Sequence, residues 1–560
     1  MSKNRKGKLE LDWVDKGDII LTKFDEKGKT YPASYRQGQI DDEELMPREF
    51  ELIESVGDPK SDNILIWGEN LIALRSLEKE FAGRIKLIYI DPPFNTGQDF
   101  EDYEDGLEHS IWLSMMENRL RLAEKFLRND GVFCIHINHH EYARLKIILD
   151  EIMGPSNYID TLSLKVRHED RILKGDKYTH DVIEYILLYS KNREHFKIAK
   201  RKIDNKDFSK YCYDVKTHSI GFKQTIGNKV VELFKTNQYD IVKGVPDRSK
   251  LQKINIRGSI KEGNSSGRFY EKFLAPRIKA DDYGTLYKVP SIGDDSLGFR
   301  YFINPISKIY RNGHYFQGVP QSHKKLRELP YPNFLDITEP LNRVQVEGSV
   351  IFRNAKKTEV LLKFLLKLSN PKHGDIILDY FAGSGTTGAV AHKMGMRWIM
   401  IEIGEQAKKV CLRRMKNVVN GDSTGISKEV GWKCGGGFKF YKLGEPLIVK
   451  HKVYHSIKII NPKYYNTELI KAICNINGFK FRKGYKVHHG VNKLGNKYAH
   501  ITDQYVSQSY IDFLKSKLAD NEEMIIYCFN YDDKINLPSN MIIKKLPTDL
   551  CKAYQLRLEL

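Results

Sequence analysis

Short apolar runs alternate with amphipathic segments in two separate stretches of the chain. Apolar runs that end at a charged residue, Gly or Pro are typical of buried strands, whereas apolar residues three and four positions apart are typical of helices. In the first stretch we expect strands at Ile64–Trp67, Leu87–Ile90 and Val132–Ile137, and helices at Leu71–Phe81, Ser110–Asn129 and Glu141–Met153. Alternation of this kind predicts one half of a parallel α/β sheet.

The same alternation returns after a long interval. We expect helices at Glu359–Leu368 and Glu405–Val418, and strands at Asp375–Tyr380, Arg397–Ile403 and Phe438–Leu443. The interval has only short strand-like pieces, such as His180–Ser190, among polar loops. We therefore predict an α/β, Rossmann-like core with an inserted domain and a small C-terminal α/β domain. The expected parts are an N-terminal arm or subdomain (1–60), the two core halves (61–160 and 341–445), the insertion (161–340) and the C-terminal domain (446–560).

The distribution of charge indicates a function for the insertion. The chain of 560 residues has a formal net charge of +19 at pH 7, which favours an acidic polymer such as nucleic acid as a partner. Lys and Arg exceed Asp and Glu by 13 in residues 161–340 and by 8 in residues 441–560, so the rest of the chain is close to neutral. A solvated insertion with its own small core is the alternative. Aromatic residues that could stack on bases are interleaved with the basic residues: Tyr178, Phe196, Phe208, Tyr211, Tyr213, Phe222, Phe269, Tyr270, Tyr315 and Phe316.

The cysteines and the apolar runs exclude several classes of protein. The seven cysteines are scattered and form no CxxC pair. We therefore expect no metal site and a reducing, cytoplasmic environment. No apolar run approaches the length of a membrane span, and the N-terminus lacks the apolar segment of a signal peptide.

The strand expected to end at Ile90 is followed directly by Asp91-Pro92-Pro93-Phe94. The two prolines fix φ and stiffen the chain, so an acid, a rigid turn and an aromatic ring follow one another at the carboxyl edge of the sheet. Open α/β sheets bind ligands at this edge. An ordinary strand exit would have much the same residues, so the motif becomes informative only together with a second one.

The second motif, Phe381 to Gly388, is a glycine-rich turn between an expected strand and an expected helix. Its GxGxxG spacing is typical of dinucleotide sites, and Glu402 at the end of the next strand could accept both ribose hydroxyls. An NAD-dependent dehydrogenase is therefore one interpretation. Asp379 favours another, because a carboxylate before the loop repels a pyrophosphate and attracts a cation. Together with the ring of Phe381, it favours S-adenosylmethionine, an adenosine that carries a sulfonium.

The order of the two motifs resembles that of a known family. DPPF at Asp91–Phe94, a basic insertion and then FAGSG at Phe381–Gly385 resemble the β class of amino-DNA methyltransferases. The neighbouring sequences IWGENLIALRSL, LIYIDPPFNTG and EYILLYSKN resemble the modification (Mod) subunits of Type III restriction–modification systems. The resemblance is strong over 60–190 and 345–445 and weak over 195–340, the region expected to choose the DNA sequence.

The resemblance implies a site-specific DNA methyltransferase that transfers a methyl group from S-adenosyl-L-methionine to the N6 amine of a flipped-out adenine. Asp91 and the Pro92 carbonyl would hold the amine hydrogens, and Phe94 would stack on the base. The catalytic residues would be Asp91, Pro92, Pro93 and Phe94. The cofactor residues would be Asp379, Phe381, Gly383, Gly385, Thr386, Glu402, Glu69, Asn70, Lys357 and Thr358. For Lys357, a solvated lysine at the start of a helix is the alternative.

The resemblance also implies partners. These are double-stranded DNA, a restriction (Res) subunit and a second copy of the chain in a homodimer, with the insertion as the target-recognition domain. Asp rather than Ser before the two prolines resembles the adenine-N6 enzymes more than the cytosine-N4 enzymes. Cytosine-N4 methylation stays open as an alternative, and so does a DNA-binding module with a vestigial cofactor site.

Overall fold

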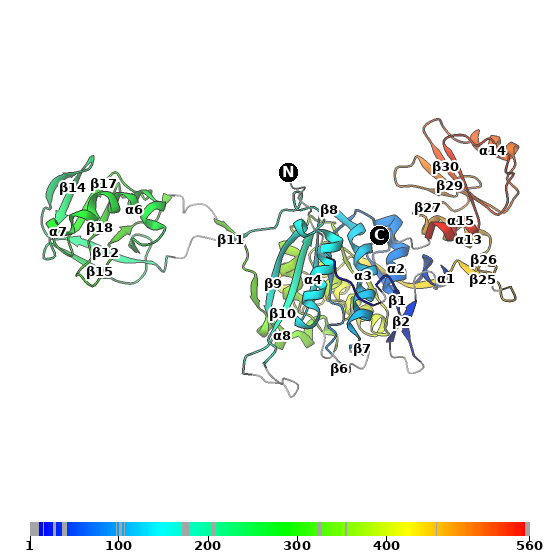
Figure 1. The fold of residues 1–560 in the computed structure, drawn as a ribbon, viewed down its shortest axis with the longest axis horizontal. Helices are drawn as coiled ribbons and strands as arrows, with labels where there is room; N and C mark the ends of the chain where they lie inside the picture. Colours follow the sequence, from blue (N-terminus) through cyan, green and yellow to red (C-terminus); the bar gives the residue numbers. More distant parts are fainter. Residues whose placement is uncertain are drawn as a thin grey trace, which may run out of the picture. The chain divides into compact units, whose positions relative to one another are not determined.

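The computed structural model describes residues 10–554 except residues 15, 26–29, 36–41, 97, 100–103, 106, 171–178, 204–207, 322–326, 353–355 and 455. Tyr178 therefore lies outside the described residues. The chain forms two compact units, Lys200–Tyr331 and the remainder, Met1–Ala199 with Pro332–Leu560. Figure 1 shows the elements of both units.

The larger unit is built around a ten-stranded mixed sheet with the order β21-β9-β10-β8-β5-β22-β23-β4-β24-β3. Figure 1 labels its strands β8, β9 and β10. The six strands from β8 to β24 are parallel to one another, whereas β10 and β3 pair antiparallel with β8 and β24. This sheet confirms the predicted α/β core. Its strands are β3 (Arg48–Gly57), β4 (Ile64–Trp67), β5 (Ile85–Ile90), β8 (Leu127–Ile137), β9 (Tyr158–Lys165), β10 (Ile183–Ser190), β21 (Phe334–Asp336), β22 (Ile376–Asp379), β23 (Arg397–Glu402) and β24 (Gly437–Pro446).

Helices pack against this sheet and bury its central strands. The principal helices are α2 (Asn70–Phe81), α3 (His109–Phe126), α4 (His139–Met153), α9 (Glu359–Leu368), α10 (Thr386–Lys393), the π-helical segment η6 (Ala407–Leu412) and α11 (Arg413–Val419). Ile88 and Ile90 of β5 share one apolar core with α2, α3 and α4. Leu87 and Tyr89 are buried on the opposite face of the strand. Burial on both faces explains why β5 is a continuous apolar run rather than an alternating one.

Two predicted helices differ from the structure. Helix α3 ends at Phe126 rather than Asn129, because Leu127 is extended and pairs with Ile85 of β5. The helix predicted over Glu405–Val418 consists of η6 followed by α11.

The two halves of the core interleave at the centre of the sheet. Strands β5 and β22 are neighbours, with Leu378 paired to Ile88. After β5 the chain continues through α3 to β8, and after β22 it continues through α10 to β23 on the other side. Because the connections leave in opposite directions, a crevice is expected between the carboxyl ends of these two strands, and ligands bind at such positions in open α/β sheets.

The boundaries of the parts differ from those predicted. The insertion begins at residue 200 rather than 161 and ends at 331 rather than 340, because β9 and β10 pair with each other and with β8. The first sixty residues are not a separate arm, since β3 belongs to the main sheet. Residues 446–554 share a compact unit with the core, because Met46 lies in their apolar cluster and Lys463 pairs with Glu51 of β3.

The C-terminal residues form a small α/β layer with the strand order β27-β28-β29-β30-β31 (Figure 1). Strands β29, β30 and β31 are parallel, as expected for an α/β arrangement. Its elements are β27 (Lys480–Phe481), β28 (Gly490–Val491), β29 (Lys497–Thr502), β30 (Glu523–Cys528), β31 (Met541–Lys545), α13 (Asn466–Ile476), α14 (Gln508–Lys515) and α15 (Thr548–Tyr554). Over the described part of the chain, no helix is both long and apolar enough to cross a membrane.

Short elements complete the larger unit. Three two-stranded sheets pair β1 with β2, β6 with β7 and β25 with β26. The elements are β1 (Ile19–Phe24), β2 (Thr30–Tyr35), β6 (Gln98–Asp99), β7 (Glu104–Asp105), β25 (Ile448–Lys450), β26 (Lys458–Ile460), α1 (Asp42–Leu45), η1 (Pro155–Asn157), α8 (Thr338–Asn342), η5 (Val344–Ser349) and α12 (Ser427–Val430).

The smaller unit, Lys200–Tyr331, contains an eight-stranded antiparallel sheet with the order β13-β14-β17-β18-β19-β16-β12-β15. Its strands are β12 (Tyr211–Thr217), β13 (Phe222–Ile226), β14 (Lys229–Phe234), β15 (Tyr239–Lys243), β16 (Leu251–Asn255), β17 (Leu286–Pro290), β18 (Phe299–Ile303) and β19 (His314–Gln317), with the separate pair β11 (Arg201–Ile203) and β20 (Arg327–Leu329). Its helical segments are α5 (Ile260–Gly263), α6 (Ser265–Phe269), η2 (Tyr270–Leu274), η3 (Ala275–Arg277) and α7 (Ile278–Asp281).

Most aromatic residues expected to contact DNA are buried instead. Phe269, Tyr270 and Tyr315 form part of one apolar cluster of the smaller unit, and Phe316 lies in another. These side chains form the hydrophobic core of the smaller unit. A unit of 132 residues with a separate sheet needs such a core to be stable. Phe222 on β13 is 71% exposed and stays available for an external contact.

Candidate active site

Asp91 and Asp379 lie at the carboxyl ends of two neighbouring strands. Asp91 directly follows β5, and Asp379 is the last residue of β22. The parallel pairing of these strands brings together two motifs that are far apart in the sequence. The structure thus gives one site with two sides, the Asp91 turn and the glycine loop.

The turn after Asp91 is anchored to the core by Trp112. The indole Nε1 of this fully buried residue donates a hydrogen bond to the Pro93 carbonyl at 2.9 Å. Asn95 follows with a positive φ of 58° and donates from Nδ2 to Glu141 at 2.7 Å. The Pro-Pro turn is therefore fixed at both ends.

Asp91 faces a cation. Its Oδ1 lies 3.4 Å from Nζ of Lys357 and 4.0 Å from Nδ1 of His136. Burial raises the pKa of Asp91, and Lys357 and His136 oppose that rise. Of the described residues, none donates a hydrogen bond to Oδ1. The carboxylate is thus buried beside a positive charge and still has acceptor capacity for a ligand.

Glu184 is a second carboxylate at this site, and the sequence analysis did not identify it. Its Oε2 lies 3.2 Å from Nζ of Lys357 and 2.7 Å from Nε2 of His136. Burial favours the neutral acid, but Lys357 and His136 outweigh burial and lower the pKa of Glu184. The same two carboxylates, Asp91 and Glu184, outweigh the effect of burial on Lys357 and raise its pKa. Lys357 is therefore not the solvated lysine considered as an alternative.

Phe94 lies beside the same cluster. Nζ of Lys357 is 4.6 Å from the centre of its ring, and the ring of His136 is 5.6 Å away. The ring is only partly buried. An exposed ring surface close to a carboxylate suits a flat ligand that carries a hydrogen-bond donor.

The glycine loop is shaped around Asp379. Its carboxylate accepts hydrogen bonds from the Phe381 amide at 3.0 Å and from the Thr387 hydroxyl at 2.5 Å. Burial raises the pKa of Asp379 to about 7. Gly383 and Gly385 have positive φ angles of 51° and 76°, a region that favours glycine. The nearest atoms to a Cβ at Gly383 would be 4.0 Å away, at the limit of van der Waals contact, so no neighbouring group crowds the backbone there.

Glu402 closes the other side of the loop. It accepts hydrogen bonds from the amides of Gly383 at 2.7 Å, Ile403 at 3.0 Å and Gly404 at 3.2 Å. Burial raises its pKa, and these amides oppose the rise. The carboxylate is thereby oriented at the loop, the position expected for it.

Glu69 and Asn70 lie beside the start of the loop. Glu69 accepts from the Ile72 amide at 2.9 Å and caps α2, and it also pairs with the buried Arg119. Asn70 donates from Nδ2 to the Tyr380 carbonyl at 2.8 Å. Both side chains are therefore held by protein contacts, and they position the chain that leads into the loop.

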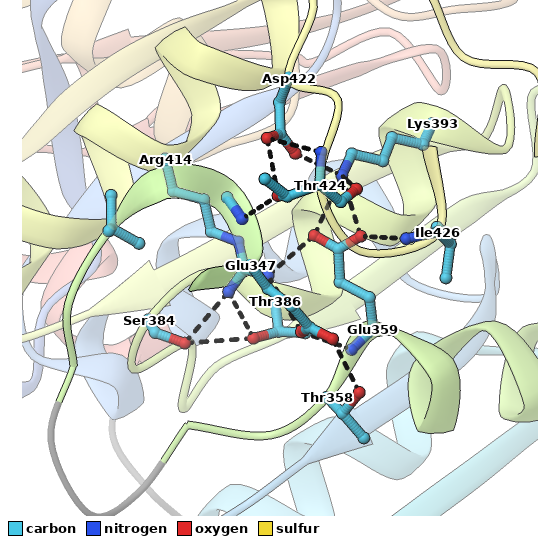
Figure 2. Close-up of polar contacts among 12 residues, drawn as sticks. Glu347, Thr358, Glu359, Ser384, Thr386, Lys393, Arg414, Asp422, Thr424 and Ile426 are labelled. Carbon is cyan, nitrogen blue, oxygen red and sulfur yellow. Dashed lines mark hydrogen bonds and ion pairs between the residues drawn. The ribbon is translucent and has the colours of Figure 1, made fainter. Parts of the chain in front are cut away.

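A buried polar network lies beneath the loop (Figure 2). Arg414 donates to the hydroxyls of Ser384 at 3.3 Å and Thr386 at 2.7 Å and pairs with Glu359 at 2.9 Å. Lys393 pairs with Glu359 at 2.9 Å and with Asp422 at 2.6 Å. Through Arg414 the network joins the glycine loop to Glu359 at the start of α9. These hydrogen bonds and ion pairs hold the loop in place.

Thr358 belongs to this network rather than to the open part of the site. Its hydroxyl donates to Glu347 at 2.8 Å and accepts from the Val360 amide at 3.3 Å, which caps α9. The residue is fully buried. Thr358 therefore fixes the backbone next to Lys357.

The site can be compared with the groups expected to occupy it. Among the described residues, no cluster of three His, Cys, Asp or Glu side chains is suited to a metal ion. A buried carboxyl group with a pKa of about 7 gains from a cation beside it. The uncrowded backbone at Gly383 and the half-buried Phe381 leave room for an adenosyl group. These residues fit a cationic nucleoside better than a pyrophosphate.

Residues 85–413 match the family described as DNA methylase. The matched region covers more than half of the chain and contains both Asp91 and Asp379. The chain therefore belongs to the DNA methylase family.

Several curated proteins are similar to the chain. The probable type III restriction-modification enzyme HindVI Mod subunit of Haemophilus influenzae is 33% identical over 411 residues, which cover 68% of this chain and 54% of that protein. The StyLTI Mod subunit of Salmonella typhimurium is 27% identical over 361 residues, 58% of this chain and 49% of that protein. The EcoP15I Mod subunit of Escherichia coli is 27% identical over 406 residues, which cover 62% of this chain and 59% of that protein. The chain thus spans about half the length of these relatives.

Proposed function

We propose that the protein transfers a methyl group from S-adenosyl-L-methionine to the N6 amine of adenine in double-stranded DNA, as the modification subunit of a Type III restriction–modification system. One observation carries the proposal. Asp91 and Asp379 end neighbouring parallel strands where the connections diverge, in a chain of the DNA methylase family. The similarity to three Mod subunits supports the finer assignment.

S-adenosyl-L-methionine would supply the electrophilic methyl group on its sulfonium. In the proposed binding mode, ionised Asp379 faces the positively charged end of the molecule and Glu402 accepts the ribose hydroxyls. Gly383 and Gly385 allow the backbone to approach closely, and Phe381 packs against the adenosyl group. This assigns one side of the site, Asp379 to Glu402, to the methyl donor.

The other side of the site would hold the base. An exocyclic adenine amine is a poor nucleophile while its lone pair is delocalised into the ring. Asp91 accepts one amine hydrogen and the Pro92 carbonyl the other, which draws the lone pair out of the ring plane. Phe94 stacks on the base, which has to leave the duplex to reach this position. The enzyme acts by positioning and electrostatics, and no covalent enzyme intermediate forms.

Balance of the reaction requires one proton to leave. The amine nitrogen forms a bond to the methyl carbon as the carbon–sulfur bond breaks, and the electron pair of that bond stays on sulfur. The nitrogen then carries a positive charge and loses one hydrogen as a proton. Asp91, whose pKa is raised by burial, is placed to accept it.

The smaller unit would grip and select the DNA. In residues 200–331 Lys and Arg exceed Asp and Glu by 13, and neutralisation of phosphates supplies most sequence-independent affinity. The exposed Phe222 and Ile220, 71% and 91% exposed, could contact bases or sugars. By their names the relatives are subunits of restriction-modification enzymes, so we include a Res subunit and a second copy of this chain among the proposed partners.

The proposal is tested by incubating the full chain with labelled S-adenosyl-L-methionine and unmodified genomic DNA. We expect N6-methyladenine in the product, identified by nucleoside mass spectrometry. Asp91→Ala should abolish transfer while cofactor affinity, measured by calorimetry, persists. Glu429→Gln on α12 is the matched control, because it removes a carboxylate that pairs with Lys363 of α9 and belongs to neither motif. N4-methylcytosine as product would instead assign cytosine-N4 methylation, and no transfer to any DNA would contradict the proposed activity.

A further inference from the structure

Lys357 occupies the place that the proposed function gives to the target base. Its Nζ lies 3.4 Å from Oδ1 of Asp91 and 4.6 Å from the centre of the Phe94 ring. A flipped adenine would present its amine to the same carboxylate and its face to the same ring. The ammonium group and the base would therefore compete for Oδ1 of Asp91 and for the face of the Phe94 ring next to Lys357.

Glu184 offers Lys357 a second binding partner. Its Oε2 already accepts a hydrogen bond from Nζ of Lys357 at 3.2 Å, so the lysine keeps this partner when it leaves Asp91. Glu184 is itself fixed, because Nε2 of the fully buried His136 lies 2.7 Å from it. Nδ1 of His136 is in turn 3.1 Å from the Tyr89 hydroxyl. The second carboxylate is thus anchored in the sheet.

The backbone of Lys357 is held while its side chain has room to move. The Thr386 hydroxyl donates to its carbonyl at 3.1 Å, and Thr358 next to it is fixed in the buried network. A pocket of about 170 Å³ is lined by Lys357, Glu184 and His136 together with Val166, Arg167 and other residues. The lysine can therefore withdraw from Asp91 without a movement of α9.

We propose that Lys357 is a placeholder for the target base, and that Glu184 is the positioning residue that retains Lys357 when the base enters. The inference rests on the proposed function. In the base-free protein Lys357 neutralises Asp91 and covers Phe94. On base entry Lys357 gives up its contact with Asp91, keeps its hydrogen bond to Glu184 and retains its proton, and Asp91 becomes free to accept the amine hydrogen. No bond forms or breaks in this step.

The proposal predicts a specific pattern in paired variants. Glu184→Gln removes one of the two carboxylates that Lys357 contacts among the described residues, so Lys357 pairs more strongly with Asp91, the base has to displace that pair, and the KM for DNA should rise about ten-fold. Glu184→Asp keeps the charge and should restore most of the loss. The double variant Glu184→Gln with Lys357→Met removes the competitor, and its KM for DNA should return to within about three-fold of the wild-type value. A purely structural role of Glu184 would give no such rescue.

Each variant is assayed with full-length protein, labelled S-adenosyl-L-methionine and unmodified genomic DNA, and cofactor affinity is measured separately by calorimetry. Glu429→Gln removes the carboxylate paired with Lys363 of α9 and should leave both readings unchanged. If Lys357→Met weakens cofactor binding and the double variant is no better than Glu184→Gln, Lys357 is a cofactor ligand and the inference is overturned.

The remaining outcomes are also decisive. If Glu184→Gln does not fold, the Lys357→Met variant tests the inference by itself. If Lys357 is a placeholder, this variant should have an unchanged or lower KM for DNA and the same cofactor affinity as the wild type. A higher KM for DNA in that variant overturns the inference. Failure of the wild-type protein to methylate any DNA refutes the proposed function itself and this inference with it, and it is distinguished by the wild-type assay alone.

Discussion

The Thr386 hydroxyl donates a hydrogen bond to the backbone carbonyl of Lys357 at 3.1 Å. Thr386 begins α10 directly after the glycine loop, and Lys357 reaches Asp91 with its side chain. Arg414 donates to the same Thr386 oxygen at 2.7 Å, which leaves the hydroxyl hydrogen for Lys357. One hydrogen bond thus joins the loop proposed to hold the cofactor to the cluster proposed to hold the base.

Asp379 should make cofactor binding dependent on pH. Burial raises its pKa to about 7 from an ordinary value of 3.8, and a sulfonium favours the ionised form. The Kd for S-adenosyl-L-methionine should therefore fall as pH rises from about 5.5 to about 7 and then level off. Asp379→Asn should abolish this dependence and weaken binding at pH 8 by about ten-fold or more. Calorimetry between pH 5.5 and 8.5 measures both effects.

The free energy of unfolding should fall over the pH range in which cofactor affinity rises. Comparison of the wild type with Asp379→Asn shows this effect. Between pH 3.8 and about 7 the folded chain keeps a proton on Asp379 that the unfolded chain has released. The contribution of Asp379 to the free energy of unfolding is therefore fully present below pH 3.8 and declines as pH rises toward 7. Urea unfolding of the wild type and Asp379→Asn across this window measures the difference. A constant difference across it would show that the folded pKa of Asp379 is not raised.

Lys393 is expected to be essential for stability. Its side chain is fully buried between Glu359 and Asp422, beside Thr424 in the network of Figure 2. Lys393→Met leaves the carboxylates short of a positive charge in the core. We expect a loss of about 3–5 kcal/mol in the free energy of unfolding, measured by urea denaturation. Lys428→Met, at an exposed position of α12, is the control and should change stability by less than about 0.5 kcal/mol.

Phe94 should contribute to DNA affinity and not to cofactor affinity. Stacking of a base on an aromatic ring contributes about 1–3 kcal/mol, so Phe94→Ala should raise the KM for DNA by about ten-fold or more. Phe94→Tyr keeps the ring and should retain most of the activity. Steady-state kinetics with varied DNA, and calorimetry with the cofactor, distinguish the two affinities. An unchanged KM in Phe94→Ala would mean that another group holds the base.

The strand ends of the site could be predicted because their signals are local. Asp91 and Asp379 each directly follow a short apolar run, and such runs identify buried strands without knowledge of their partners. The bounds of β4 and α9 agree with those predicted from the same kind of pattern.

Glu184 and His136 were missed because their proximity is not local. Ile186 of β10 pairs antiparallel with His136 of β8, and no pattern within either strand shows which strands will pair. The available signal was Glu184 itself, a charged residue within the apolar run that becomes β10. The limits of the insertion were misplaced for the same reason, because β9 and β10 join the sheet by long-range antiparallel pairing.

The position of β22 and β23 between β5 and β4 also has a consequence for synthesis of the chain. When the ribosome has made residues 64–137, β5 can pair with β8, but the edge that will receive β22 has no partner, and β4 still lacks both β23 and β24. The unpaired edges of these apolar strands stay exposed until residues 376–446 emerge from the ribosome. Exposed apolar strand edges are sites of aggregation. The arrangement that brings the two motifs together thus requires the nascent chain to protect unfinished strands while the whole insertion is being translated.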